Sequence, residues 1–146
     1  MLDSHHAQAI RARIARIPIV DTLRMRDFDL EPGVCRATVP RQRVFDGVFE
    51  SLHGGILMTV ADSIACFAIL TLTSADQLMT TTDMNIRFLA PCLIDVRATA
   101  RVIKRGKSMC PVSVELHDTN GTLVAVAQVN YLLLHRMPTR TVPAET

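Results

Sequence analysis

The sequence predicts an α+β fold in which an antiparallel sheet of five to six strands is wrapped around one long helix. Residues 51–75 contain a single charged residue, Asp62, and are largely apolar, which is typical of a buried helix. Beyond them the hydrophobic period changes to two, the pattern of strands that turn one face to a core. Short connections between these strands imply antiparallel pairing, with the helix covered by the sheet.

The elements before the long helix are shorter. Apolar residues recur at helical spacing over Asp3–Arg16 and predict a basic surface helix within residues 1–18, which Pro18 interrupts. Two short strands are expected at Val20–Arg26 and Val34–Val39, on either side of the Glu31-Pro32-Gly33 turn.

A loop over residues 40–51 leads into the long helix, which begins near His53-Gly54-Gly55 and fades around Thr73-Ser74. Four further runs are then expected as strands, at 83–88, 96–102, 112–117 and 123–134. Asn120-Gly121 marks a hairpin between the last two. Residues 138–146 are expected to be a loose tail, and the whole chain, 1–146, to form one domain.

Composition excludes several function classes. The formal charge is only +2, there is no Trp and one Tyr, and no basic cluster is interleaved with aromatics, so nucleic-acid binding is not expected. The four cysteines are scattered without a Cys-x-x-Cys pair and the histidines are far apart or terminal, so no metal site is expected. Asp62 near the middle of the apolar stretch argues against a membrane span. The N-terminus does not resemble a secretory signal, which leaves the cytoplasm as the expected location.

His53-Gly54-Gly55 stands where the long helix begins. The first N–H groups of a helix lack internal partners and carry the positive end of its dipole, and glycine leaves them open to a ligand oxygen. Such an N-terminus can polarise a carbonyl and stabilise an oxyanion. A plain glycine-rich helix entry is the alternative.

Asp62 is the second chemical feature. An unpaired carboxylate within an apolar helix is costly to bury, so it faces either a functional cleft or a local partner, such as the hydroxyl of Thr59 or Ser63. Gly54 and Asp62 are separated by about 12 Å along one helix, so they cannot both contact one reacting carbonyl. If both act on one substrate, the site combines residues of two subunits, and a dimer is required.

Several motifs occur in one order along the chain: His53-Gly54-Gly55, Ala61-Asp62-Ser63, the run Thr81–Pro91 (TTDMNIRFLAP) and Lys104-Arg105-Gly106-Lys107. Together they resemble the phenylacetyl-CoA-type thioesterases of the hotdog superfamily, over about residues 34–135. The resemblance implies a hotdog fold and hydrolysis of an acyl-CoA or aryl-CoA thioester, without metal or redox cofactor. It also implies a homodimer, and two such dimers are expected to pair into a tetramer.

The same resemblance implies roles for individual residues. Asp62 is then the general base or nucleophile, and Gly54 is the amide donor to the thioester carbonyl. His53 shapes that end of the helix, and Thr81 positions the attacking water, unless it is an ordinary strand threonine. The substrate-binding residues expected beside them are Gly55, Asp46, Gly47, Asn85, Lys104, Arg105, Gly106 and Lys107.

Two of these assignments carry alternatives. Many relatives have an Asn six residues before the His, which helps to orient the attacking water or carboxylate, and this chain has Gly47 there. Either Asp46 or a shifted loop compensates for the absent side chain, or the chemistry is slower or different. The basic turn at 104–107 either binds the phosphates of coenzyme A or is a solvated hairpin. Arg41 and Arg87 are weaker candidates for the same phosphates, and surface solubility explains them equally well. Two other functions therefore stay open, a non-catalytic acyl-CoA-binding protein and a hydratase or dehydratase. The acyl group is not legible from the sequence.

Overall fold

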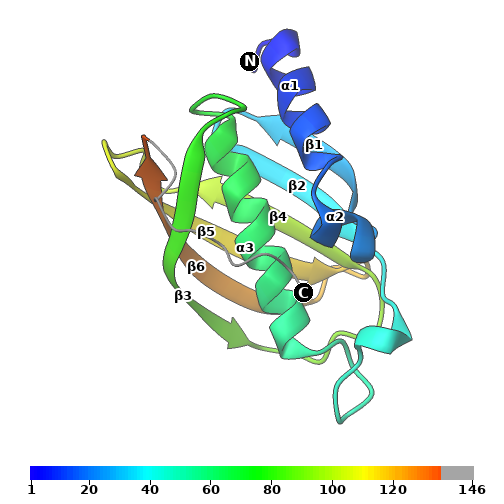
Figure 1. Cartoon of the computed structure of the whole chain (residues 1–146). Helices are drawn as coiled ribbons and strands as arrows, with labels where there is room; N and C mark the ends of the chain where they lie inside the picture. Colours follow the sequence, from blue (N-terminus) through cyan, green and yellow to red (C-terminus); the bar gives the residue numbers. More distant parts are fainter. Residues whose placement is uncertain (136–146) are drawn as a thin grey trace, which may run out of the picture.

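The computed structural model describes residues 1–135, which form a six-stranded antiparallel sheet wrapped around one helix (Figure 1). The strands are β1 (Arg26–Glu31), β2 (Val34–Val39), β3 (Leu78–Phe88), β4 (Val96–Val102), β5 (Met109–Asp118) and β6 (Leu123–Leu134). Their order across the sheet is β1-β2-β4-β5-β6-β3. The predicted α+β architecture is thereby confirmed, whereas the tail expected at 138–146 lies outside the described residues.

The central helix, α3 (Gly54–Leu70), lies in the curve of the sheet and packs against β2 to β6. Val60, Ala61 and Ile64 on its inner face are fully buried, and burying one large aliphatic side chain stabilises the fold by about 1.5–3 kcal/mol. The helix ends three residues earlier than predicted, because Thr71 caps it: its hydroxyl donates to the Ala68 carbonyl at 2.6 Å. No helix within residues 1–135 has the length and apolarity to cross a membrane.

The N-terminal segment corrects one prediction. Residues 20–26 were expected to be a strand, but Pro18–Thr22 forms a short helix, α2, and β1 begins only at Arg26. Pro18 occupies the first turn of α2, where its fixed φ favours a helix and its missing N–H costs nothing, so this proline starts a helix. The helix predicted before it is α1 (Ser4–Ile14), which buries Ile10 and Ile14.

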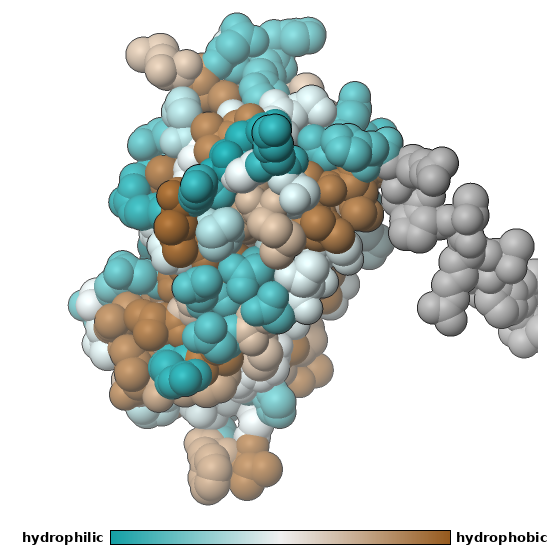
Figure 2. Space-filling model, turned by 90° about the vertical axis from the view of Figure 1, so that its left-hand side faces the viewer, coloured by the Kyte–Doolittle hydropathy of each residue, from teal (hydrophilic) through white to brown (hydrophobic). Residues whose placement is uncertain are grey.

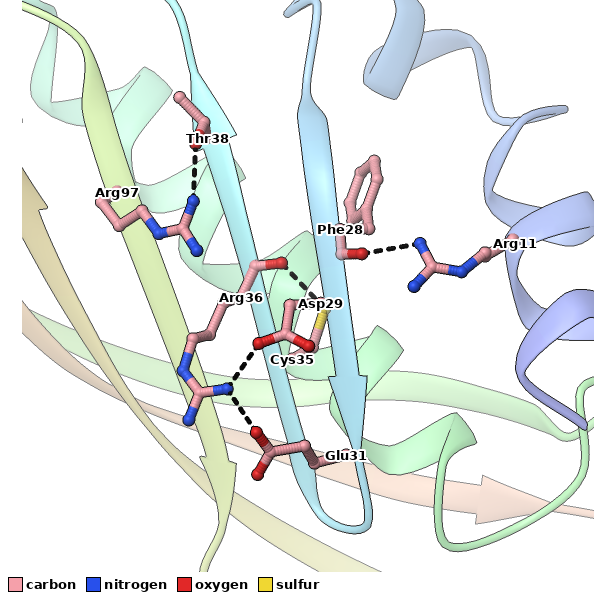
Figure 3. A network of polar contacts seen from close by, with 8 residues as sticks. All are labelled: Arg11, Phe28, Asp29, Glu31, Cys35, Arg36, Thr38 and Arg97. Carbon is pink, nitrogen blue, oxygen red and sulfur yellow. Dashed lines mark hydrogen bonds and ion pairs between the residues drawn. The ribbon is translucent and has the colours of Figure 1, made fainter. Parts of the chain in front are cut away.

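The two edges of the sheet differ in their protection. At the β1 edge, Arg11 of α1 donates to the Phe28 carbonyl at 2.6 Å, and Arg36 of β2 pairs with Asp29 and Glu31 at 2.8 and 2.9 Å (Figure 3). At the opposite edge, β3 pairs with β6 on one side, and no other strand of the described chain pairs with its outer side. On this side of the molecule, apolar patches lie among polar ones (Figure 2). A strand of 11 residues with a free edge is a ready site for pairing with another chain.

The β5–β6 hairpin forms where it was predicted. Its turn, 119–122, contains Gly121 with φ of +88°, in the left-handed region that glycine adopts without a steric penalty. This turn sets the register of β6 against β5, and β6 in turn sets the register of β3 beside α3.

Candidate active site

The carboxylate of Asp62 lies between α3 and the two strands β3 and β6. Its Oδ1 accepts a hydrogen bond from the Thr81 hydroxyl at 2.6 Å and another from the Tyr131 hydroxyl at 2.8 Å. Thr81 and Tyr131 are directly opposite one another in the β3–β6 ladder, so adjacent strands supply both donors. Hydrogen bonds to an ionised acceptor are stronger than neutral ones, and this pair fixes one oxygen of the carboxylate.

The second carboxylate oxygen of Asp62, Oδ2, is left open. Among residues 1–135 no group donates to Oδ2, and no side-chain polar atom there is both buried and unpaired. The local partners considered from the sequence are engaged elsewhere: Thr59 donates to the Gly55 carbonyl and Ser63 to the Thr59 carbonyl. Asp62 therefore combines one restrained oxygen with one oxygen that can accept a proton or attack.

The start of α3 leaves one amide without a partner. His53 is the N-cap, and its Nδ1 accepts the Gly55 N–H at 2.8 Å, while its carbonyl accepts from Ile56 and Leu57. The Gly54 N–H has no acceptor within the described chain. The positive end of the helix dipole is thus concentrated at this amide, which suits it to a carbonyl oxygen. Because Gly55 donates to His53, its own amide is already occupied.

An apolar groove of about 580 Å³ opens beside Gly54. The ring of Phe88 is half exposed and borders it so closely that a Cβ atom on Gly54 would lie 3.0 Å from Phe88 Cζ. The other lining residues come from the loop before α3, from α3 and from the segment after β3: Phe49, Ser51, Leu52, Leu57, Leu89, Ala90, Pro91 and Cys92. Only Ser51 among these side chains is polar, so the groove suits an apolar group.

Gly47 and Asp46 lie beside the start of the helix but differ in availability. A Cβ atom on Gly47 would lie 3.3 Å from His53 Cδ2, so position 47 adjoins the helix cap. Asp46 is held by Arg41, whose Nε and Nη2 donate to its two oxygens at 3.2 and 2.5 Å. These hydrogen bonds raise the pKa of the Arg41 guanidinium further. Arg41 and Asp46 therefore satisfy one another.

Within one subunit, the predicted basic turn lies far from Gly54, and the predicted Asn85 lies on the outer face of the sheet. The turn 104–107 follows β4, whose last residue, Val102, donates to the Gly33 carbonyl beside Leu72, near the end of α3. Gly54 is at the other end of this helix, about 25 Å away for 17 residues. Asn85 is exposed and pairs with Gln128, on the face of the sheet opposite to the buried Val129. Asp62, about 12 Å from Gly54 along α3, forms a separate cluster with Thr81 and Tyr131.

Tyr131 is a residue of the Asp62 cluster that the sequence reasoning missed. It is the only tyrosine of the chain, and it stands in a run that is otherwise apolar except for Gln128 and Asn130. A lone hydroxyl in a strand whose residues are apolar on both faces is the signal that could have marked it. Within residues 1–135 no three His, Cys, Asp or Glu side chains are grouped as a metal site.

Comparison with known proteins places the chain in a family. Residues 49–125 match the family model described as Thioesterase superfamily. The chain belongs to this superfamily. Acyl-coenzyme A thioesterase 13 of Homo sapiens is 36% identical over 99 residues, which cover 64% of this chain and 69% of that protein.

Solved structures of the superfamily have the same fold. A thioesterase family protein from Silicibacter pomeroyi is 27% identical with a TM-score of 0.82, and the match covers 88% of this chain and 98% of that one. The E. coli PaaI protein from the phenylacetic acid degradation operon has the same TM-score at 20% identity, covering 92% and 96%. The prediction of a hotdog-fold thioesterase is therefore confirmed.

Proposed function

We propose that this thioesterase hydrolyses an acyl-CoA or aryl-CoA thioester to the free acid and coenzyme A at a site shared by two subunits. The observation that carries the proposal is the Asp62 carboxylate, which has one oxygen fixed by two hydroxyls and the other open. The name of the human relative, an acyl-coenzyme A thioesterase, supports this class of substrate.

In the proposed reaction, a water molecule attacks the thioester carbonyl while Asp62 Oδ2 takes its proton. The Gly54 N–H donates to the carbonyl oxygen and stabilises the negative charge that forms there. The tetrahedral intermediate then collapses, the C–S bond breaks, and coenzyme A leaves with the proton. Direct attack by Oδ2 would form an anhydride that water then hydrolyses, and both routes use the same open oxygen.

The need for two subunits follows from distance. Gly54 and Asp62 are about 12 Å apart along α3, too far to contact one carbonyl. Antiparallel pairing of β3 with its copy would bring the Phe88 end of one strand beside the Leu78 end of the other. The partner's Gly54, which adjoins Phe88, would then approach Asp62, which adjoins Thr81. Further pairing into a dimer of dimers stays a prediction.

The apolar groove beside Gly54 is the proposed acyl site, because a carbonyl held at this amide would place its acyl chain there. Leu52 and Phe88 border the groove. The exposed turn of Lys104, Arg105 and Lys107 remains the proposed contact for the phosphates of coenzyme A.

A non-catalytic acyl-CoA-binding protein is the second candidate, since Gly47 offers no side chain to orient water. A hydratase is less well supported, because His53 Nδ1 accepts the Gly55 N–H and is thereby committed to the helix cap.

The test is release of coenzyme A, detected with a thiol reagent, from short, medium, long and aryl acyl-CoAs. Parent protein is compared with Asp62→Asn and with Asp76→Asn, a matched control in the exposed connection after α3. Background from the protein will be low, because burial raises the pKa of all four of its thiols. Hydrolysis that falls by orders of magnitude only in Asp62→Asn, to a residual rate that is still measurable, supports the proposal. Binding without release in the parent would instead favour the second candidate.

A further inference from the structure

We infer that Tyr131 is a positioning residue for the reaction, which orients the Asp62 carboxylate so that Oδ2 faces the substrate. This inference rests on the proposed function and deepens it. Tyr131 does not have to touch the substrate, because its effect is transmitted through Asp62.

The contacts of the Tyr131 hydroxyl support this role. The hydroxyl lies 2.8 Å from Asp62 Oδ1 and 2.7 Å from the Asp62 backbone carbonyl, and both of these atoms can only accept. A phenol has one proton to donate, so it must remain protonated to stabilise either contact. Tyr131 therefore bridges the side chain and the backbone of the same residue, which restrains rotation of the carboxylate.

The surroundings of Tyr131 keep it a donor. The side chain is 5% exposed, and burial, together with the nearby Cys66 and Asp62, raises the pKa of its phenol well above the usual value. Thr81 holds the same Oδ1 from the neighbouring strand at 2.6 Å. With two donors on Oδ1, proton transfer and attack are directed to Oδ2, to which no group in residues 1–135 donates a hydrogen bond.

A residue that only fills the core would behave differently from one that positions Asp62. Tyr131→Phe keeps the ring and removes the hydroxyl, so the apolar packing on β6 is preserved. A hydrogen bond to a charged group that is lost at the reacting residue should lower kcat by about ten- to a hundred-fold. KM should stay near its parental value, because the acyl groove and the basic turn are untouched.

The experiment measures kcat and KM for five proteins: the parent, Tyr131→Phe, Asp62→Asn, the double variant and a control, Thr71→Val. The expected result is a lower kcat in Tyr131→Phe, an unchanged KM, and no further loss when Tyr131→Phe is added to Asp62→Asn. Thr71→Val is the matched control, because it removes a buried hydroxyl that bonds to Ala68 and Gly33, outside the site. It should lower stability and leave kcat near the parental value.

Each outcome has a defined meaning. An active parent whose kcat is unaffected by Tyr131→Phe overturns the inference and leaves the proposed function intact. An equal loss in the parental and Asp62→Asn backgrounds also overturns it, since Tyr131 would then act independently of Asp62. A parent without hydrolase activity overturns the proposed function and this inference together.

A spectroscopic measurement covers the case in which Tyr131→Phe does not fold. The chain has one Tyr and no Trp, so its near-ultraviolet tyrosine spectrum reports Tyr131 alone. Asp62→Asn should alter this spectrum in the folded protein, because it changes the acceptor of the phenol. An identical spectrum in the two proteins would overturn the inference.

Discussion

Replacement of Gly54 by proline and by alanine separates the role of its amide from that of its missing side chain. Both substitutions add a Cβ atom, which would lie 3.0 Å from Cζ of Phe88, but only proline removes the N–H. Proline is tolerated at the first position of a helix. His53, which precedes it, has φ of −57° and ψ of 135°, the extended conformation that a residue before proline requires. Both variants should therefore fold.

The expected magnitudes follow from this geometry. The Gly54 N–H has no acceptor in the described chain, so its loss should cost little stability. Phe88 is half exposed and can turn away from the new Cβ, so Gly54→Ala should retain part of the activity. Loss of one oxyanion donor lowers kcat by about 10²- to 10³-fold, and this is the additional loss expected for Gly54→Pro over Gly54→Ala.

Mixing Gly54→Pro with Asp62→Asn subunits tests whether the site is shared. In a mixed dimer, Asp62 of the first subunit meets Gly54 of the second, so one of the two sites is intact. Random association makes half of the dimers mixed, which gives about a quarter of the parental activity. The measurement is coenzyme A release after the two variants are unfolded and refolded together. Activity no higher than that of the separate variants would refute the shared site, because two sites within single subunits would both be damaged.

Three further results are expected. His53→Ala removes the acceptor of the Gly55 N–H and should cost about 0.5–2 kcal/mol in urea unfolding, whereas His53→Asn keeps a cap and should keep kcat. If both lower kcat equally, His53 takes part in the chemistry. Gly47 adjoins His53 and does not have a left-handed φ, so Gly47→Asn should fold and should raise kcat. An unchanged kcat would mean that the side-chain amide absent at position 47 does not limit the rate. Burial raises the pKa of Cys66 from 9.0 to about 11, so the folded state holds this proton more tightly than the unfolded state. The contribution of the protonated Cys66 thiol to the free energy of unfolding is present below pH 9.0 and should be lost as the pH rises through about 11. Urea unfolding at several pH values should show this loss, and Cys66→Ala should reduce it.

Most of the fold follows from short-range patterns in the sequence. The predicted runs 96–102 and 123–134 coincide with β4 and β6, because strict alternation or a long apolar run bounded by turn residues leaves few other structures. The strand predicted at 20–26 was wrong because a proline can end one helix and also begin the next, and the sequence pattern alone does not separate these two roles. Asp62 could be singled out as a candidate site residue because it is the sole charge in an apolar helix.

The partners of Asp62 depend on a detail that periodicity does not contain. The alternation of Met84 and Ile86 with Asp83 and Asn85, extended backwards, would turn Thr82 toward the helix and Thr81 away from it. In the structure the register shifts between Thr81 and Asp83, so that Thr81 lies opposite Tyr131 and Asp83 opposite Asn130. This bulge at Thr82 lets Thr81 and Met84 share the inner face although they are three residues apart. The two hydroxyls that meet on Asp62 Oδ1 are therefore a product of strand register, which is set by the pairing of β3 with β6.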